Sequence, residues 1–232
     1  MSRPSDEVVV LLHGLAETPL IMAPLEIALL REGYRIHNPG YPSTSATIEE
    51  LATKFVRPLL HDFPEAGRIH FVTHSLGGVL LHYCLQSERP ANLGRVVMTA
   101  PGLQGSEALE AYRHNWLFRM IYGPASFQSG TAADAFARCL EKDAKYDLGV
   151  IAGCVSLDLV ANLFIPWPHD GKIGVARTKI AGLKDHLVLP TAHDLIASDP
   201  VAIAQTARFL RSGHFFHLMS PDEAVGSGAL AA

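Results

Sequence analysis

Cysteine is scarce in this sequence of 232 residues, and the few cysteines present do not suggest a covalent scaffold. The three of them, Cys84, Cys139 and Cys154, form no C-x-x-C motif and cannot all pair with one another. We therefore expect neither a disulfide framework nor a zinc ribbon, and a reducing compartment suits the chain better than secretion.

Positive charge is also limited. The chain has 19 Lys and Arg residues against 23 Asp and Glu residues, a net charge of -4 with His neutral, and no dense basic block. This balance argues against nucleic acid as a partner. The 12 histidines make the net charge rise as the pH falls towards about 6.

Long apolar runs are missing as well. The polar residues 1–7 lead into a short apolar run, Val8 to Leu12, which stops at His13-Gly14. A transmembrane helix needs about 20 apolar residues, and a signal peptide needs a cleavage region, which this segment lacks. We expect a cytoplasmic protein without a transmembrane segment. The spacings H-E-x-x-H and H-x-x-E-H do not occur either, so we expect no metal site and no cofactor.

Short apolar strands and amphipathic helices alternate along most of the chain. An unbroken apolar strand such as the first is typical of a sheet that is buried on both faces. The alternation predicts an α/β fold with a mostly parallel central sheet and helices on both faces, in a single domain over residues 1–232. We expect strands at 8–12, 34–38, 68–73, 95–100, 148–152 and about 186–189, and helices at 18–31, 47–60 with a break near Pro58, 75–86 and 199–211.

The alternation breaks between Gly102 and about Asp143. We predict a helical cap insertion over about 105–143, at the carboxyl edge of the sheet, where alternating α/β folds bind ligands. The apolar residues of this insertion would line an acyl pocket or form ordinary core beneath a layer of helices. They are Trp116, Leu117, Phe118, Met120 and Ile121.

The residues best suited to catalysis lie at 73–78, Thr-His-Ser-Leu-Gly-Gly, between a predicted strand and a predicted helix. A turn of this kind strains the backbone of the serine and lifts its hydroxyl clear of the sheet. Gly77 meets the need for a small residue two positions after Ser75, whereas Thr73 is bulkier than the Gly of the form G-x-S-x-G. The Leu76 amide, at the start of the helix, is a natural donor to an oxyanion. The alternative role for Ser75 is a helix N-cap.

With these features the sequence resembles the α/β-hydrolase fold family, and within it the serine lipases and esterases, over almost the whole chain. The resemblance rests on His13-Gly14 after the first strand, the turn at Ser75, Asp170-Gly171 and His193. In relatives with such a His-Gly, the next residue supplies a second oxyanion amide. The resemblance implies that this residue is Leu15.

Ser75 needs a base, and the family carries it between a late strand and the last helix. His193 lies in that position, after the strand predicted near 186–189. His186 is its nearest rival.

The acid that would orient the imidazole follows the serine and precedes the histidine. Asp170 lies in a Pro-His-Asp-Gly turn, 23 residues before His193, similar to the Asp-Gly turn that carries the acid in bacterial lipases. Asp158 follows the strand predicted at 148–152, where many other members of the family carry theirs. Asp185 and Asp194 are weaker candidates. Asp-Gly also marks plain turns, so Asp158 stays open as the alternative to Asp170.

These residues predict a serine hydrolase that cleaves carboxylic esters, of esterase or lipase type, through a Ser75-His193-Asp170 triad and an acyl-enzyme. The expected partner is a small-molecule ester with an apolar acyl group. Two alternatives remain: an acyltransferase or amidase with the same triad, and an inactive pseudoenzyme that binds an apolar ligand.

Overall fold

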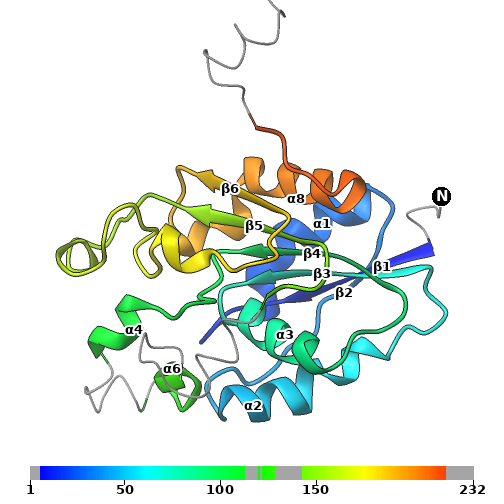
Figure 1. The fold of residues 1–232 in the computed structure, drawn as a ribbon, viewed down its shortest axis with the longest axis horizontal. Coiled ribbons are helices and arrows are strands. Elements are labelled where there is room, and N and C mark those ends of the chain that lie inside the picture. The colour runs from blue at the N-terminus through cyan, green and yellow to red at the C-terminus, as the bar shows by residue number, and fades with distance from the viewer. Residues whose placement is uncertain (1–5, 113–119, 121, 129–142, 218–232) are drawn as a thin grey trace, which may run out of the picture.

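Six parallel strands form the sheet at the centre of the molecule (Figure 1). The computed structural model describes residues 6–112, 120, 122–128 and 143–217. The strands lie in the order β2-β1-β3-β4-β5-β6, and each neighbouring pair is parallel, so the predicted sheet is confirmed. Their bounds are β1 Glu7–Leu12, β2 Arg35–His37, β3 Arg68–His74, β4 Leu93–Thr99, β5 Leu148–Gly153 and β6 Asp185–Leu189.

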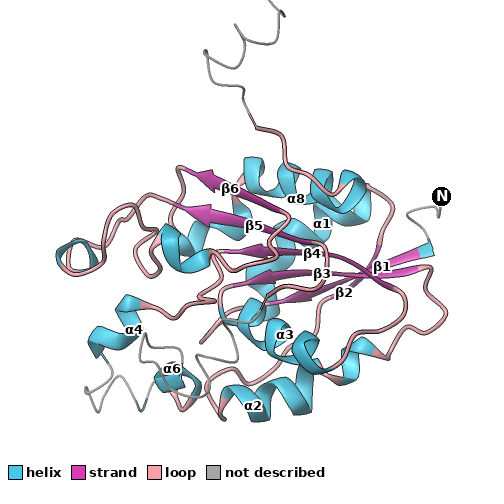
Figure 2. Ribbon diagram, in the orientation of Figure 1, coloured by secondary structure: helices cyan, strands magenta, loops and turns pink. Residues whose placement is uncertain are grey.

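Helices cover both faces of the sheet, as Figure 2 shows and as the alternation predicts. Helices α1 (Ala23–Arg31) and α8 (Pro200–Ser212) pack against one face. Helices α2 (Ile48–Leu51) and α3 (Leu76–Ser87) pack against the other. Each face therefore has its own apolar core, and the sheet separates the two.

The apolar run Val8 to Leu12 in strand β1 is explained by the two cores that its side chains enter. Side chains of a strand alternate between the two faces of its sheet. Val8, Val10 and Leu12 belong to the core under α2 and α3, while Val9 and Leu11 belong to the core under α1 and α8. Since both faces are covered, apolar side chains are favoured on each.

The predicted helix at 47–60 is not one regular helix. It begins as α2 with a capping box, in which Thr47 and Glu50 satisfy each other's backbone amides. It continues as a π-helical turn over Ala52–Val56, closed by Arg57 N donating to Ala52 O at 2.8 Å. A short 3-10 turn, Pro58–Leu60, ends it. Because proline has no N–H to donate, the regular ladder cannot pass Pro58, and the predicted break is found there.

Two short helices of the predicted cap insertion lie within the described residues, α4 (Glu107–Tyr112) and α6 (Ala125–Gln128). Helix α6 is tied to α2, because the Gln128 side chain accepts from Ile48 N at 2.7 Å and donates to Glu49 at 2.6 Å. The side chain of Met120 is 68% exposed. The other apolar residues expected to line the pocket, Trp116, Leu117, Phe118 and Ile121, lie outside the described residues. The cap over 105–143 and the single domain over 1–232 stay predictions.

Across the described part of the chain, no helix has the length and apolar character required to cross a bilayer.

Candidate active site

Ser75 lies at the sharp turn between β3 and α3, with φ 50° and ψ -119°. Such a positive φ is strained for any residue with a side chain, and strain of this kind persists only where neighbours hold it. Here Ser75 N donates to Thr99 O in β4 at 3.0 Å. Ser75 does occupy the N-cap position of α3, but its hydroxyl makes no capping hydrogen bond. The side chain is therefore free to project from the turn, and we call residues 73–78 the nucleophile elbow.

The elbow packs tightly against the end of β1, and two glycines make this possible. A Cβ atom at Gly77 would lie 2.6 Å from Leu12 O and 2.7 Å from His13 O, closer than real Cβ atoms approach. A Cβ atom at Gly78 would lie 3.1 Å from the Thr73 hydroxyl. The absence of a side chain at Gly78 thus leaves room for Thr73, which departs from the G-x-S-x-G form.

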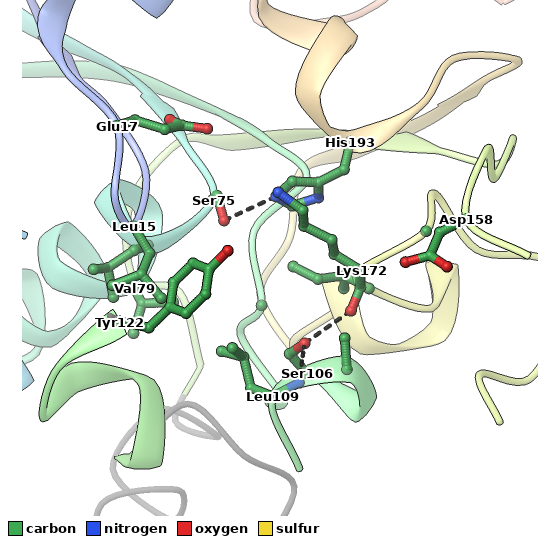
Figure 3. Close-up of a pocket in the computed structure, with 15 residues that line it drawn as sticks. Leu15, Glu17, Ser75, Val79, Ser106, Leu109, Tyr122, Asp158, Lys172 and His193 are labelled. Carbon is green, nitrogen blue, oxygen red and sulfur yellow. Dashed lines mark hydrogen bonds between the residues drawn. The ribbon is translucent and has the colours of Figure 1, made fainter. Parts of the chain in front are cut away.

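A chain of hydrogen bonds joins Ser75, His193 and Asp170. Figure 3 shows its first link, between Ser75 and His193. His193 begins the short helix after β6, His193–Ser198, and its ring is buried. Its Nε2 lies 3.0 Å from Ser75 Oγ and its Nδ1 lies 2.8 Å from Asp170 Oδ2. The structure thus brings together three side chains that lie up to 118 positions apart in the sequence.

Asp170 is the most enclosed of the three, with 2% of its surface exposed. Its Oδ1 accepts from the amides of Lys172 at 3.0 Å and Ile173 at 2.8 Å. Burial favours the neutral carboxyl. The charge and hydrogen bond of His193, together with the two amides, outweigh burial and hold the pKa of Asp170 below its usual value. The group is therefore a carboxylate that faces the imidazole.

The rival candidates lie elsewhere. Asp158 is exposed at the rim of the cavity, and its carboxylate accepts from Val160 N at 2.8 Å and Ala161 N at 3.1 Å, within its own turn. His186 Nε2 lies 2.9 Å from Thr178 Oγ1 rather than near Ser75. Asp185 contacts His217, and Asp194 pairs with Lys172.

Two backbone amides predicted to hold an oxyanion lie beside Ser75. The Leu76 amide is at the first position of α3, where a helix leaves its N–H groups without intrahelical acceptors. Leu15 lies in the segment 13–17 after β1, which we call the oxyanion loop. The amides on either side of it are occupied, because Gly14 N donates to Glu17 Oε2 at 2.7 Å and Ala16 N donates to Ser43 Oγ at 2.9 Å. The Leu15 amide has no acceptor in the described part of the chain.

A cavity of about 190 Å³ opens onto Ser75 and His193. Its wall is largely apolar, with Leu15, Leu76, Val79, Leu109 and Ile173, and its polar groups include Glu17, Ser106, Tyr122 and Lys172. Within residues 6–112, 120, 122–128 and 143–217, no three His, Cys, Asp or Glu side chains gather in a way that could hold a metal ion.

Reasoning from the sequence missed the group that holds the oxyanion loop. Tyr41 stacks on His13 with ring centroids 4.1 Å apart and donates its hydroxyl to His13 O. Glu17, the last residue of the loop, lies next to His74. Burial raises the pKa of Glu17, but His74, the Gly14 amide and the charge of His193 outweigh it and bring the pKa to about 2. The one signal in the sequence is the spacing of Glu17, three residues after Gly14, from which a side chain can reach back to an amide, as in a capping box.

Comparison with known proteins agrees with this architecture. Residues 9–226 match the family described as the alpha/beta hydrolase family. The mature lipase BlEst2 of Bacillus licheniformis has a similar structure, with a TM-score of 0.71 and 14% identity over 92% of this chain and 94% of that chain. Phospholipase PlaB of Legionella pneumophila, in complex with thio-NAD, has a TM-score of 0.73 and 16% identity over 95% of this chain and 60% of that chain.

The metagenomic carboxyl esterase MGS0156 has a TM-score of 0.68 and 19% identity, over 92% of this chain and 75% of that chain. At such identities the likeness shows the fold. No curated protein matches the sequence. The match to the family extends over nearly all of the sheet, the nucleophile elbow and the two segments that carry Asp170 and His193. The chain belongs to the alpha/beta hydrolase family.

Proposed function

We propose that this protein is a serine hydrolase that cleaves carboxylic esters of small molecules, with Ser75 as nucleophile, His193 as base and Asp170 as the acid that orients His193. The observation that carries the proposal is the unbroken chain of hydrogen bonds from Ser75 Oγ through His193 to Asp170, at the wall of a cavity. A strained serine at a turn between strand and helix supports the same role.

The mechanism follows from these positions. His193 Nε2 takes the proton of the Ser75 hydroxyl as the oxygen attacks the ester carbonyl carbon. The negative charge that develops on the carbonyl oxygen is held by the amides of Leu15 and Leu76. The imidazolium returns the proton to the departing alcohol as the C–O bond breaks and leaves an acyl-enzyme. Water then attacks that acyl-enzyme with His193 again as the base, and Asp170 keeps the ring oriented throughout.

Esters with an apolar acyl group are the substrates that the cavity supports. Five of its wall residues are leucine, isoleucine or valine, and Lys172 pairs with Asp194. The similar structures include a lipase, a phospholipase and a carboxyl esterase, in keeping with this class. We further propose a cytoplasmic location, since Cys84 and Cys154 are free thiols, as suits a reducing compartment.

The test is hydrolysis of p-nitrophenyl esters from acetate to palmitate by the protein and by its Ser75→Ala variant. We expect turnover by the wild type, and a loss of at least about 10³-fold in kcat/KM in the variant, since the nucleophile is gone. The chain-length profile separates esterase from lipase. No turnover on any ester, with no labelling of Ser75 by a fluorophosphonate, would contradict the proposal and favour the ligand-binding pseudoenzyme.

A further inference from the structure

The carboxylate of Glu17 connects the oxyanion loop to the nucleophile elbow, and the mechanism above makes no use of it. One oxygen, Oε2, accepts from Gly14 N at 2.7 Å. The other, Oε1, lies 3.3 Å from His74 Nε2. In Figure 3, Glu17, Leu15 and Ser75 lie on the same side of the cavity. Glu17 therefore contacts the residue before Leu15 and the residue before Ser75.

On the loop side, the Gly14 contact is one of those that orient the Leu15 amide. The backbone of residues 14–16 is held at two amides, by Glu17 at Gly14 and by Ser43 at Ala16. Ala16 has φ 57°, a conformation that a non-glycine residue adopts only when its neighbours hold it. The peptide that carries the Leu15 amide is also held at its carbonyl, because His13 Nδ1 donates to Gly14 O at 2.9 Å. If the Gly14 amide lost its acceptor, one of these three attachments would be gone, and the Leu15 amide would be held less firmly.

The absence of a side chain at Gly14 allows the carboxylate to come this close. A Cβ atom there would lie 2.7 Å from Glu17 Oε2 and 3.1 Å from Ser75 Cβ. The backbone of Gly14 thus lies between the Glu17 carboxylate and the nucleophile. A shift of this carboxylate would be transmitted to the loop over a single hydrogen bond.

On the elbow side, the His74 ring is fixed by the sheet. Thr99 Oγ1 donates its hydrogen to Thr73 O at 3.1 Å, so the same oxygen accepts from His74 Nδ1 at 3.2 Å. The ring is fully buried and its centroid lies 4.9 Å from that of His193. Its Nε2 has no hydrogen-bond acceptor of good geometry in the described part of the chain and faces the Glu17 carboxylate. The contact with His74 therefore fixes the position of Glu17 relative to strands β3 and β4.

We propose that Glu17 is a positioning residue, whose carboxylate holds the Leu15 amide at the place where the oxyanion forms. This role rests on the proposed function, because it concerns the same reaction. Glu17 stays ionised over the working pH of an esterase, and it never exchanges a proton with the substrate. Its contribution is geometric. The positioned Leu15 amide stabilises the transition state more than the bound ester, because the carbonyl oxygen of the bound ester carries little charge.

The experiment compares Glu17→Ala and Glu17→Gln with the wild type and with Glu65→Ala. Glu65 is an exposed glutamate that contacts Arg35 at the surface, so its variant controls for the loss of a carboxylate as such. The assay measures kcat and KM for p-nitrophenyl butyrate. It also measures the Ki of a short alkyl trifluoromethyl ketone. A serine oxygen attacks the carbonyl carbon of such a ketone and forms a tetrahedral oxyanion. Thermal unfolding of each variant checks that it folds.

We expect Glu17→Ala to lower kcat by about 10- to 100-fold, less than the 10²- to 10³-fold loss that follows removal of an oxyanion donor, with KM changed by less than about 3-fold. The Ki of the ketone should rise by the factor by which kcat/KM falls, because both report the oxyanion. In Glu17→Gln the amide oxygen can still accept from Gly14 N, so kcat should return to within about 5-fold of the wild type. Glu65→Ala should behave as the wild type.

Three outcomes would overturn the role of Glu17 in an active enzyme: a kcat of Glu17→Ala within about 2-fold of the wild type, a change in KM alone, or a Gln variant as impaired as the Ala variant. The proposed function fails in a different way, since then the wild type and the Glu65→Ala control are themselves inactive. In that case the positioning role falls with it.

Discussion

At the scale of single residues, two aspartates near the cavity differ in their exposure to solvent and in the groups that their carboxylate oxygens contact. Asp158 is exposed and uses one carboxylate oxygen on two amides of its own turn. Asp170 is buried, uses Oδ1 on two amides, and keeps Oδ2 for His193. A carboxylate can stabilise an imidazolium strongly only when it is shielded from water and in direct contact with the ring. Asp170 meets both conditions.

We predict that Asp170→Asn lowers kcat by about 10²- to 10⁴-fold, because an amide neither stabilises the imidazolium nor selects the tautomer in which Nδ1 carries the hydrogen. Asp158→Asn is the matched control and should change kcat by less than about 3-fold. Steady-state hydrolysis of p-nitrophenyl butyrate measures both. The reverse order of effects would mean that Asp158 is the acid and that the loop at 170 moves in solution.

The sequence allowed the three side chains of the proposed triad to be singled out, because each lies in a local pattern. Ser75 stands between an apolar strand and a glycine pair, Asp170 in an Asp-Gly turn, and His193 between a strand and the last helix. Glu17 has no such pattern. Its importance comes from contacts with Gly14 and His74, and the contact with His74 joins segments 57 positions apart that only the folded sheet brings together.

At the scale of elements, the close approach of α3 to the end of β1 determines the shape of the elbow. The first turn of the helix lies against the carbonyl groups of Leu12 and His13, and Gly77 is the point of contact. The amide of Leu76 and the oxyanion loop can face the same point only because no side chain separates them. The elbow and the oxyanion loop therefore form one packed unit.

Gly77→Ala should disrupt this unit. The added methyl group would meet two backbone oxygens, which cannot rotate away as a side chain can, so we expect a loss of about 1–3 kcal/mol or more in the free energy of unfolding, and a fall in activity as Ser75 is displaced. Urea unfolding and ester hydrolysis measure the two effects.

Gly40→Ala is the matched control for Gly77→Ala. A Cβ atom at Gly40 would lie 3.4 Å from its nearest neighbour, an ordinary contact, so stability and activity should hardly change. If Gly77→Ala unfolded like this control, the packing against β1 would be looser than the structure shows.

Among the elements, the strands could be predicted better than the helices. Strands β1 and β5 are buried over their whole length, so their apolar runs are nearly continuous and easy to recognise. The helix at 47–60 could be recognised by its apolar spacing, but the π-helical turn at Ala52–Val56 could not. Such a turn depends on how α2 and α3 pack, and that information lies outside the segment itself.

At the scale of the whole molecule, one partly buried histidine outside the site links folding to pH. Burial of His186, assisted by the charges of Lys179 and His217 and opposed by Asp185, lowers its pKa from 6.5 to about 4. Between these two values the unfolded chain binds a proton that the folded chain does not. Protonation therefore favours unfolding, and the free energy of unfolding falls as the pH drops from 6.5 towards 4.

We predict that His186→Gln weakens this dependence. The amide of glutamine can still donate to Thr178 Oγ1, as His186 Nε2 does, but it does not titrate. Urea midpoints of the wild type and the variant should differ in how far they fall between about pH 7 and pH 5, with the smaller fall in the variant. Parallel curves would show that His186 takes up its proton equally in the folded and unfolded chain.

The position of His193 has a consequence for how the folding of this protein can be followed. His193 follows β6, and β6 is the edge strand beside β5 in the sheet that the described residues form. Ser75, by contrast, follows β3 in the middle of the sheet. A refolding chain in which four or five strands are assembled would have nearly all of its circular dichroism, but His193, the proposed base, would not yet lie beside Ser75. Recovery of ester hydrolysis would therefore time the docking of the last strand, an event that spectroscopy of the backbone would hardly register.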